Sequence, residues 1–104
     1  MLDKLNGKVL SLTGNPIMGF DKQALTVKDA LVTLCEVHKP KQSGNGEALR
    51  IFSIGLKLVA ASESLDLDEK EIQLLRKVVE DNEVFVSVVT ARLMNYIEEY
   101  AKES

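Results

Sequence analysis

The sequence predicts a mainly α-helical fold: a compact orthogonal or bundle-like domain of four helices with a short β-hairpin-like element at its N-terminus. Two patterns support this prediction. Apolar residues recur at helical spacing through most of the chain after residue 25, and residues 46–63 are apolar almost all the way round a helical wheel. The composition, 45% hydrophobic and 28% charged over 104 residues, is that of one globular domain, which we assign to residues 1–104.

Residues 1–25 are the least regular part of the chain. Residues 8–13 alternate weakly between apolar and polar side chains and favour a short strand. The Gly-Asn-Pro sequence at residues 14–16 is typical of a turn, because glycine accepts positive φ and proline fixes its own φ. We expect an irregular or β-like segment whose apolar side chains cover one end of the helical core.

The first helix is predicted over residues 26–39. Thr26 is placed to cap it, and Asp29 lies three residues later, where the helix dipole favours an acid. Apolar residues then follow the i, i+3, i+4, i+7 pattern of one helical face. The helix must stop before Pro40, and residues 39–46 form a polar, glycine-rich loop.

The second helix, residues 46–63, is expected to be the central one. Between Glu47 and Ser62 only Arg50 and Lys57 are charged, and because they are seven residues apart they point in the same direction. Such a helix has to be covered by the rest of its domain or by a partner. If the Arg50 and Lys57 edge faces the acidic second half of the chain, it stabilises the domain; if it faces solvent, it marks a partner contact.

The third helix is predicted over residues 68–81. Asp68 and Glu71 have the spacing of a capping box, in which each side chain accepts from a backbone amide of the other residue. Leu67 before the cap and Ile72 after it are placed for a hydrophobic staple. This is the best defined boundary in the sequence.

The last helix is predicted over residues 83–101, after a tight turn that makes it an antiparallel neighbour of the third helix. The β-branched residues within 84–90 are also compatible with a strand. The helical alternative is favoured by a continuous face formed by Phe85, Val89, Leu93, Tyr96 and Tyr100.

Charge is unevenly distributed along the chain, whose net charge is -3. Residues 1–57 hold 8 basic and 5 acidic residues, and residues 58–104 hold 5 and 11. This pattern is either a solvated acidic face or a polarity that helps like chains associate. The single cysteine, the lack of a signal peptide and the lack of a long apolar run predict a cytoplasmic protein with no membrane contact.

Four residues are candidate partner contacts, and no catalytic, metal-binding or cofactor-binding residue is expected. Cys35 and His38 share one helical face, but a metal site needs about four ligands and these two residues fit packing and capping roles. Tyrosine is favoured at interfaces because it offers amphipathic contact area. The candidate contacts are Arg50, Lys57, Tyr96 and Tyr100.

Three segments carry a resemblance that spans most of the chain: residues 5–8 (Leu-Asn-Gly-Lys), residues 25–31 (Leu-Thr-Val-Lys-Asp-Ala-Leu) and residues 65–74 (Leu-Asp-Leu-Asp-Glu-Lys-Glu-Ile-Gln-Leu). On these residues the chain resembles a group of small helical proteins encoded by bacteriophages and prophages, most of them without assigned function. The resemblance implies a viral or prophage origin and a workplace in the bacterial host cytoplasm or on the virion. It carries no catalytic residues.

We therefore expect a small interaction protein without catalytic activity, homo-oligomeric, that serves phage assembly or modulates a host protein. The alternative is a nucleic-acid-associated regulator that uses the basic N-terminal half, at Lys8, Lys22, Lys28, Lys39 and Lys41. An acidic chain without a basic block is a poor nucleic-acid binder, which disfavours this alternative. An enzyme that uses Cys35 and His38 as a nucleophile pair is the weakest of the three hypotheses.

Overall fold

The chain forms four helices, α1 (Val27–Val37), α2 (Glu47–Ala60), α3 (Glu69–Glu80) and α4 (Ser87–Ala101). The computed structural model describes residues 2–19, 23–38 and 46–101, and for residues 100 and 101 the backbone alone. The prediction of a mainly helical fold with four helices is confirmed. The radius of gyration, 13.0 Å, matches the value of about 13 Å typical of a compact 100-residue domain.

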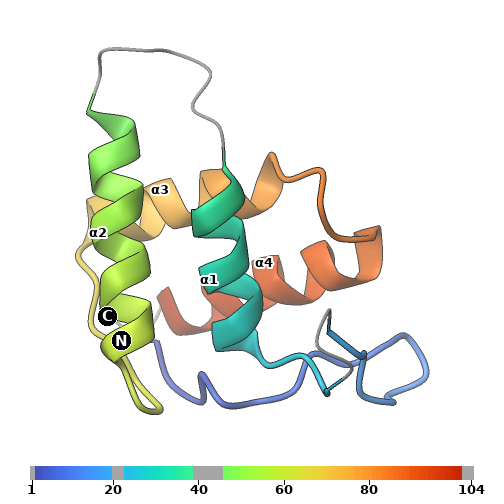
Figure 1. The fold of residues 1–104 in the computed structure, drawn as a ribbon. Coiled ribbons are helices and arrows are strands. Elements are labelled where there is room, and N and C mark those ends of the chain that lie inside the picture. Colours follow the sequence, from blue (N-terminus) through green and yellow to red (C-terminus); the bar gives the residue numbers. More distant parts are fainter. Residues whose placement is uncertain (1, 20–22, 39–45, 102–104) are drawn as a thin grey trace.

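The helices form two pairs, and the α1–α2 pair packs across the α3–α4 pair (Figure 1). Within the first pair the helices are antiparallel. Lys28, in the first turn of α1, donates from its amine to the carbonyl of Ala61 just after α2, at 2.5 Å. At the other end, His38 Nε2 lies 3.7 Å from Glu47 Oε1 at the start of α2. The core lies between the two pairs.

The N-terminal segment closes one end of this core. Leu2, Leu5 and Val9 are fully buried. Leu2 and Leu65 exchange two backbone hydrogen bonds of 2.8 Å, which ties the segment to the connection between α2 and α3. Within the described residues the pairing is limited to isolated bridges: Leu2 with Leu65, Lys8 with Thr26, Leu10 with Pro16, and Met18 with Ala24.

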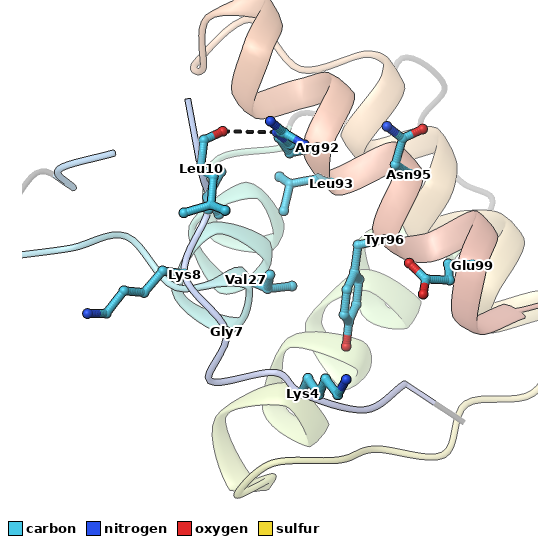
Figure 2. Close-up of a pocket in the computed structure, with 11 residues that line it drawn as sticks. Lys4, Gly7, Lys8, Leu10, Val27, Arg92, Leu93, Asn95, Tyr96 and Glu99 are labelled. Atoms are coloured by element: carbon cyan, nitrogen blue, oxygen red, sulfur yellow. Dashed lines mark hydrogen bonds between the residues drawn. The ribbon is translucent and has the colours of Figure 1, made fainter. Parts of the chain in front are cut away.

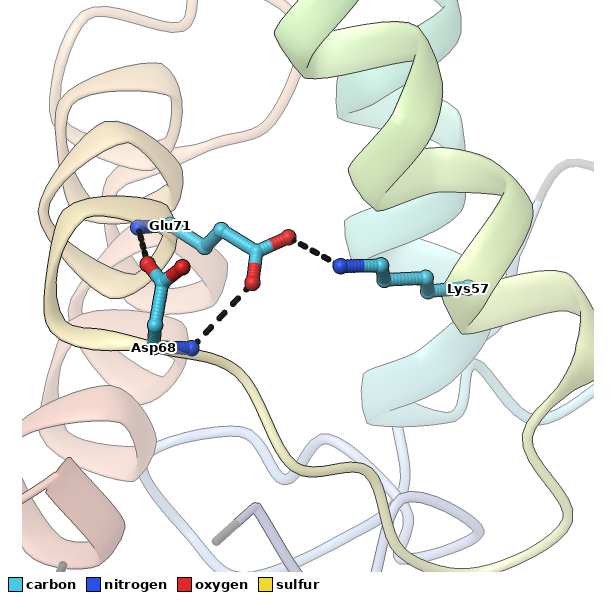
Figure 3. A network of polar contacts seen from close by, with 3 residues as sticks. All are labelled: Lys57, Asp68 and Glu71. Carbon is cyan, nitrogen blue, oxygen red and sulfur yellow. Dashed lines mark hydrogen bonds and ion pairs between the residues drawn. The ribbon is translucent and has the colours of Figure 1, made fainter.

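The predicted helix caps on α1 and α3 are confirmed. Thr26 Oγ1 accepts from the Asp29 amide at 3.1 Å. In the capping box, the Asp68 carboxylate accepts from the Glu71 amide at 2.8 Å, and the Glu71 carboxylate accepts from the Asp68 amide at 3.2 Å (Figure 3). Helix α2 begins after Gly46, which has a left-handed φ of 68° and gives no side-chain cap.

The prediction that α2 is the central helix is wrong. It lies at one edge of the molecule (Figure 1), and its buried residues are Ile51, Ile54 and Leu58. Helices α1 and α3 contact α2 on this buried side. Each neighbour can cover only one arc of a helix about 10 Å wide, so the opposite arc of α2 stays open although it is apolar.

The boundary of the last helix also differs from its prediction. Helix α4 begins at Ser87, four residues after the predicted start, and residues 83–86 are not helical. The cause is Asn82, whose Oδ1 accepts from the amides of Val84 at 3.1 Å and Phe85 at 3.0 Å. A side chain that holds two successive amides offers the backbone an alternative to the first helical turn. The other helices start one residue after, and end one to three residues before, their predicted limits.

Candidate protein-interaction face

Helix α2 carries a line of exposed apolar side chains, which we call the α2 stripe: Leu49, Phe52, Leu56 and Val59. Their exposed fractions are 74%, 63%, 55% and 58%. The steps between them are three, four and three residues, so they follow one line along the helix. Exposed apolar patches of a few hundred Å² commonly mark interaction sites. The sequence interpretation missed these four residues because it treated the whole apolar circumference of the helix as covered, and their spacing is the same as that of the buried residues Ile51, Ile54 and Leu58.

Helix α1 borders the α2 stripe on one side. Val32, Cys35 and Glu36 line a shallow hollow together with three residues of the stripe, Phe52, Leu56 and Val59. A Cβ atom added to Gly55 would lie 3.4 Å from Cys35 Cβ, at the limit of ordinary van der Waals contact, so α1 and α2 are closely packed at this point. The outer side of α1 presents two exposed acids seven residues apart, Asp29 and Glu36, which we call the acidic line.

Arg50 and Lys57 lie on the other side of the α2 stripe and form the basic edge. Lys57 Nζ donates to Glu71 Oε2 at 2.6 Å, and the same carboxylate completes the cap of α3 (Figure 3). Of the two alternatives predicted for this edge, Lys57 therefore follows the first, in which it faces the acidic second half of the chain. Arg50 is exposed and lines the groove between α2 and α3.

Tyr96, one of the two candidate tyrosines, does not add to this face. Tyr96 is 9% exposed and its hydroxyl donates to the carbonyl of Asp3 at 2.5 Å. Figure 2 shows its ring extending from α4 toward the N-terminal segment near Lys4. Arg92, one turn earlier, donates to the carbonyls of residues 10 and 11. Tyr96 thus joins α4 to the N-terminal segment, and the side chain of Tyr100 lies outside the described part of the chain.

Cys35 is half-buried between α1 and α2, and His38 at the end of α1 points to Glu47. Burial, helped by the negative charge of Glu36, raises the pKa of the Cys35 thiol to about 11. A nucleophilic cysteine needs a lowered pKa, because the thiolate is the reacting species. The environment of Cys35 therefore disfavours the chemistry that the Cys35 and His38 hypothesis requires.

We expect the stability of the protein to fall as the pH rises from about 9 to 11, partly because of Cys35. Its pKa rises from 9.0 to about 11 on folding, so in this window the folded state holds the proton more firmly than the unfolded state. The contribution is fully present below pH 9. After allowance for partial exposure, its loss is about 1 kcal/mol. Urea unfolding at pH 8 and pH 10.5 should show a smaller fall for Cys35→Ala than for the wild type. Equal falls would contradict the burial of the thiol.

The lysines of the nucleic-acid alternative are dispersed where the structure describes them. Lys28 donates from its amine to the Ala61 carbonyl, where the start of α1 lies beside the end of α2. Lys8 is exposed, and Figure 2 shows its side chain extending from the N-terminal segment away from α4. The remaining three lie outside the described residues: Lys22, Lys39 and Lys41.

Comparison with known proteins finds no matching family model, no matching curated protein and no matching solved structure. In the described ranges, no group of three or more His, Cys, Asp or Glu side chains is placed to hold a metal ion. The helices of the same residues are each too short or too polar to cross a membrane. The α2 stripe differs from the other exposed apolar residues, such as Leu12 and Val86, in that its four members lie along one line of a regular helix.

Proposed function

We propose that this protein is an interaction protein, without catalytic activity, that binds another protein chain through the α2 stripe. The observation that carries the proposal is the exposure of Leu49, Phe52, Leu56 and Val59, each by more than half, on one line of a regular helix. Covering four such side chains would contribute roughly 4 to 6 kcal/mol from burial of apolar surface. That gain is large enough to offset much of the entropy lost on association.

The setting of this interaction is part of the proposal. The resemblance of residues 5–8, 25–31 and 65–74 to phage and prophage proteins suggests a partner that belongs to a phage or to its bacterial host. On this proposal the protein works in the host cytoplasm or on the virion, where it serves assembly or modulates a host protein. The acidic net charge of -3 and the apolar stripe suit a protein partner better than a nucleic acid.

The test compares one substitution on the stripe with one on an equally exposed apolar residue elsewhere. Phe52→Glu places a charge in the middle of the stripe, while Leu12→Glu changes a side chain that is 87% exposed in the segment that contacts α4. Tagged proteins are used for affinity purification from the bacterium that carries the gene, and self-association is measured by sedimentation equilibrium. We expect the wild type and Leu12→Glu to bind the same protein, and Phe52→Glu to bind it at least about tenfold more weakly. Binding by neither method, or equal binding by all three proteins, would refute the proposal.

A further inference from the structure

The α2 stripe has the residue pattern of a two-stranded coiled coil. Leu49, Phe52, Leu56 and Val59 occupy successive a, d, a and d positions of a heptad repeat. The positions that flank such a line, e and g, hold Ala48, Ser53, Gly55 and Ala60. All four flanking residues are small and uncharged, so a second helix can approach closely without burying an unpaired charge.

The charges beside the stripe indicate which helix would cover it. Across the outer face, the acidic line (Asp29 and Glu36) borders the stripe on the α1 side, and the basic edge (Arg50 and Lys57) lies beyond the opposite side. The two charged lines are also level with each other. Glu36 lines the hollow beside Ile51 and Phe52, next to Arg50. Asp29 follows Lys28, whose amine reaches Ala61 at the same end of α2 as Lys57.

We propose that the occupant is a second copy of this chain, with the two α2 helices parallel and related by a two-fold axis that runs along them. This inference rests on the proposed function of the stripe and names its partner. A two-fold axis of this direction places the α1 helices on opposite sides of the helix pair. The acidic line of each copy then faces the basic edge of the other, with Glu36 toward Arg50. Asp29 lies level with Lys57, whose amine is already paired with Glu71 of its own copy.

The antiparallel alternative produces the wrong charge contacts. A two-fold axis perpendicular to α2 places both α1 helices on the same side, so that acidic line meets acidic line and basic edge meets basic edge. Antiparallel helix dipoles are favourable, but this effect is confined to the terminal turns and is screened by salt. Like charges in contact disfavour an interface along its whole length. The parallel pair also extends the contact from the stripe onto α1, toward the roughly 800 Å² per partner of stable interfaces.

Disulfide crosslinking distinguishes the two directions. In a Cys35→Ala background, which removes the single native cysteine, Leu49→Cys is oxidised alone and in an equal mixture with Val59→Cys. In the parallel pair Leu49 of one copy lies against Leu49 of the other copy. Leu49→Cys alone should therefore form a crosslinked dimer of about twice 11.5 kDa. Leu12→Cys serves as the control for random collision. A crosslinked dimer that forms only in the mixture, and not with Leu49→Cys alone, would overturn the parallel arrangement. A yield of crosslinked dimer no higher than that of Leu12→Cys in both samples would overturn the α2 contact.

A charge exchange tests the pairing between copies. Sedimentation equilibrium should show a dimer for the wild type, with Glu36→Lys and Arg50→Glu each weakening it by about five- to tenfold. The double variant Glu36→Lys and Arg50→Glu should recover most of this loss. If the double variant instead loses dimer affinity by the sum of the two single losses, the proposed pairing is overturned. A wild type that stays monomeric, yet captures an unrelated protein in a way that depends on Phe52, would overturn the self-association and leave the proposed function standing. A monomer whose captures do not depend on Phe52 would remove both.

Discussion

Replacement of Leu58 by alanine is expected to destabilise the domain by about 3 kcal/mol, whereas the same change at Leu56 should cost less than about 1 kcal/mol. The two leucines are two residues apart in α2, but Leu58 is fully buried and Leu56 is 55% exposed. Truncation of Leu58 removes apolar contacts and leaves a cavity between α2 and its neighbours. Truncation of Leu56 removes contacts mainly with solvent.

Urea unfolding of both variants at low protein concentration measures this difference. Both variants replace a leucine of α2 by alanine and remove the same side-chain atoms, so the change in helix propensity cancels in the comparison. If α2 were covered on all sides, as its composition predicts, the two losses would be similar. At high protein concentration the Leu56→Ala variant should be less stable than the wild type by a larger amount. The reason is that the self-association proposed above raises the apparent free energy of unfolding of the wild type.

The features that the sequence predicts well are those set by a few neighbouring residues. The caps at Thr26 and at Asp68 with Glu71 each lie within a window of four residues, and both form the predicted hydrogen bonds. The four helices likewise follow from local periodicity. Their ends depend on competing local contacts, and Asn82 displaces the start of α4 for that reason.

The arrangement of the helices in space depends on contacts between distant residues, and periodicity does not predict it. A helix that is apolar all round gives no indication of which arc its neighbours will cover. In α2 the buried arc is that of Ile51, Ile54 and Leu58: α1 packs closely beside Gly55 on one side of it, and Lys57 binds Glu71 of α3 on the other. The candidate interaction face lies on the arc of α2 that α1 and α3 leave uncovered.

Replacement of Asn82 by alanine is the second substitution with a large expected effect, a loss of about 2 to 3 kcal/mol. This side chain makes four hydrogen bonds in the connection between α3 and α4. Nδ2 donates to the Val79 carbonyl at 2.5 Å and to Thr90 Oγ1 at 3.0 Å, while Oδ1 accepts from the amides of Val84 and Phe85. Alanine leaves these groups, which are partly buried except for the exposed Val84 amide, without the partner that fixes the angle at which α4 begins.

Thermal or urea unfolding of Asn82→Ala and Asn82→Asp separates the two ends of the amide. Aspartate keeps the oxygen that accepts from Val84 and Phe85 but loses both donated bonds, so it should cost about half as much as alanine. Glu83→Ala is the control, because this neighbouring side chain is exposed and should change stability by less than about 0.5 kcal/mol. An Asn82→Ala loss no larger than that of the control would mean that packing of Phe85, and not the asparagine, holds residues 83–86 out of the helix.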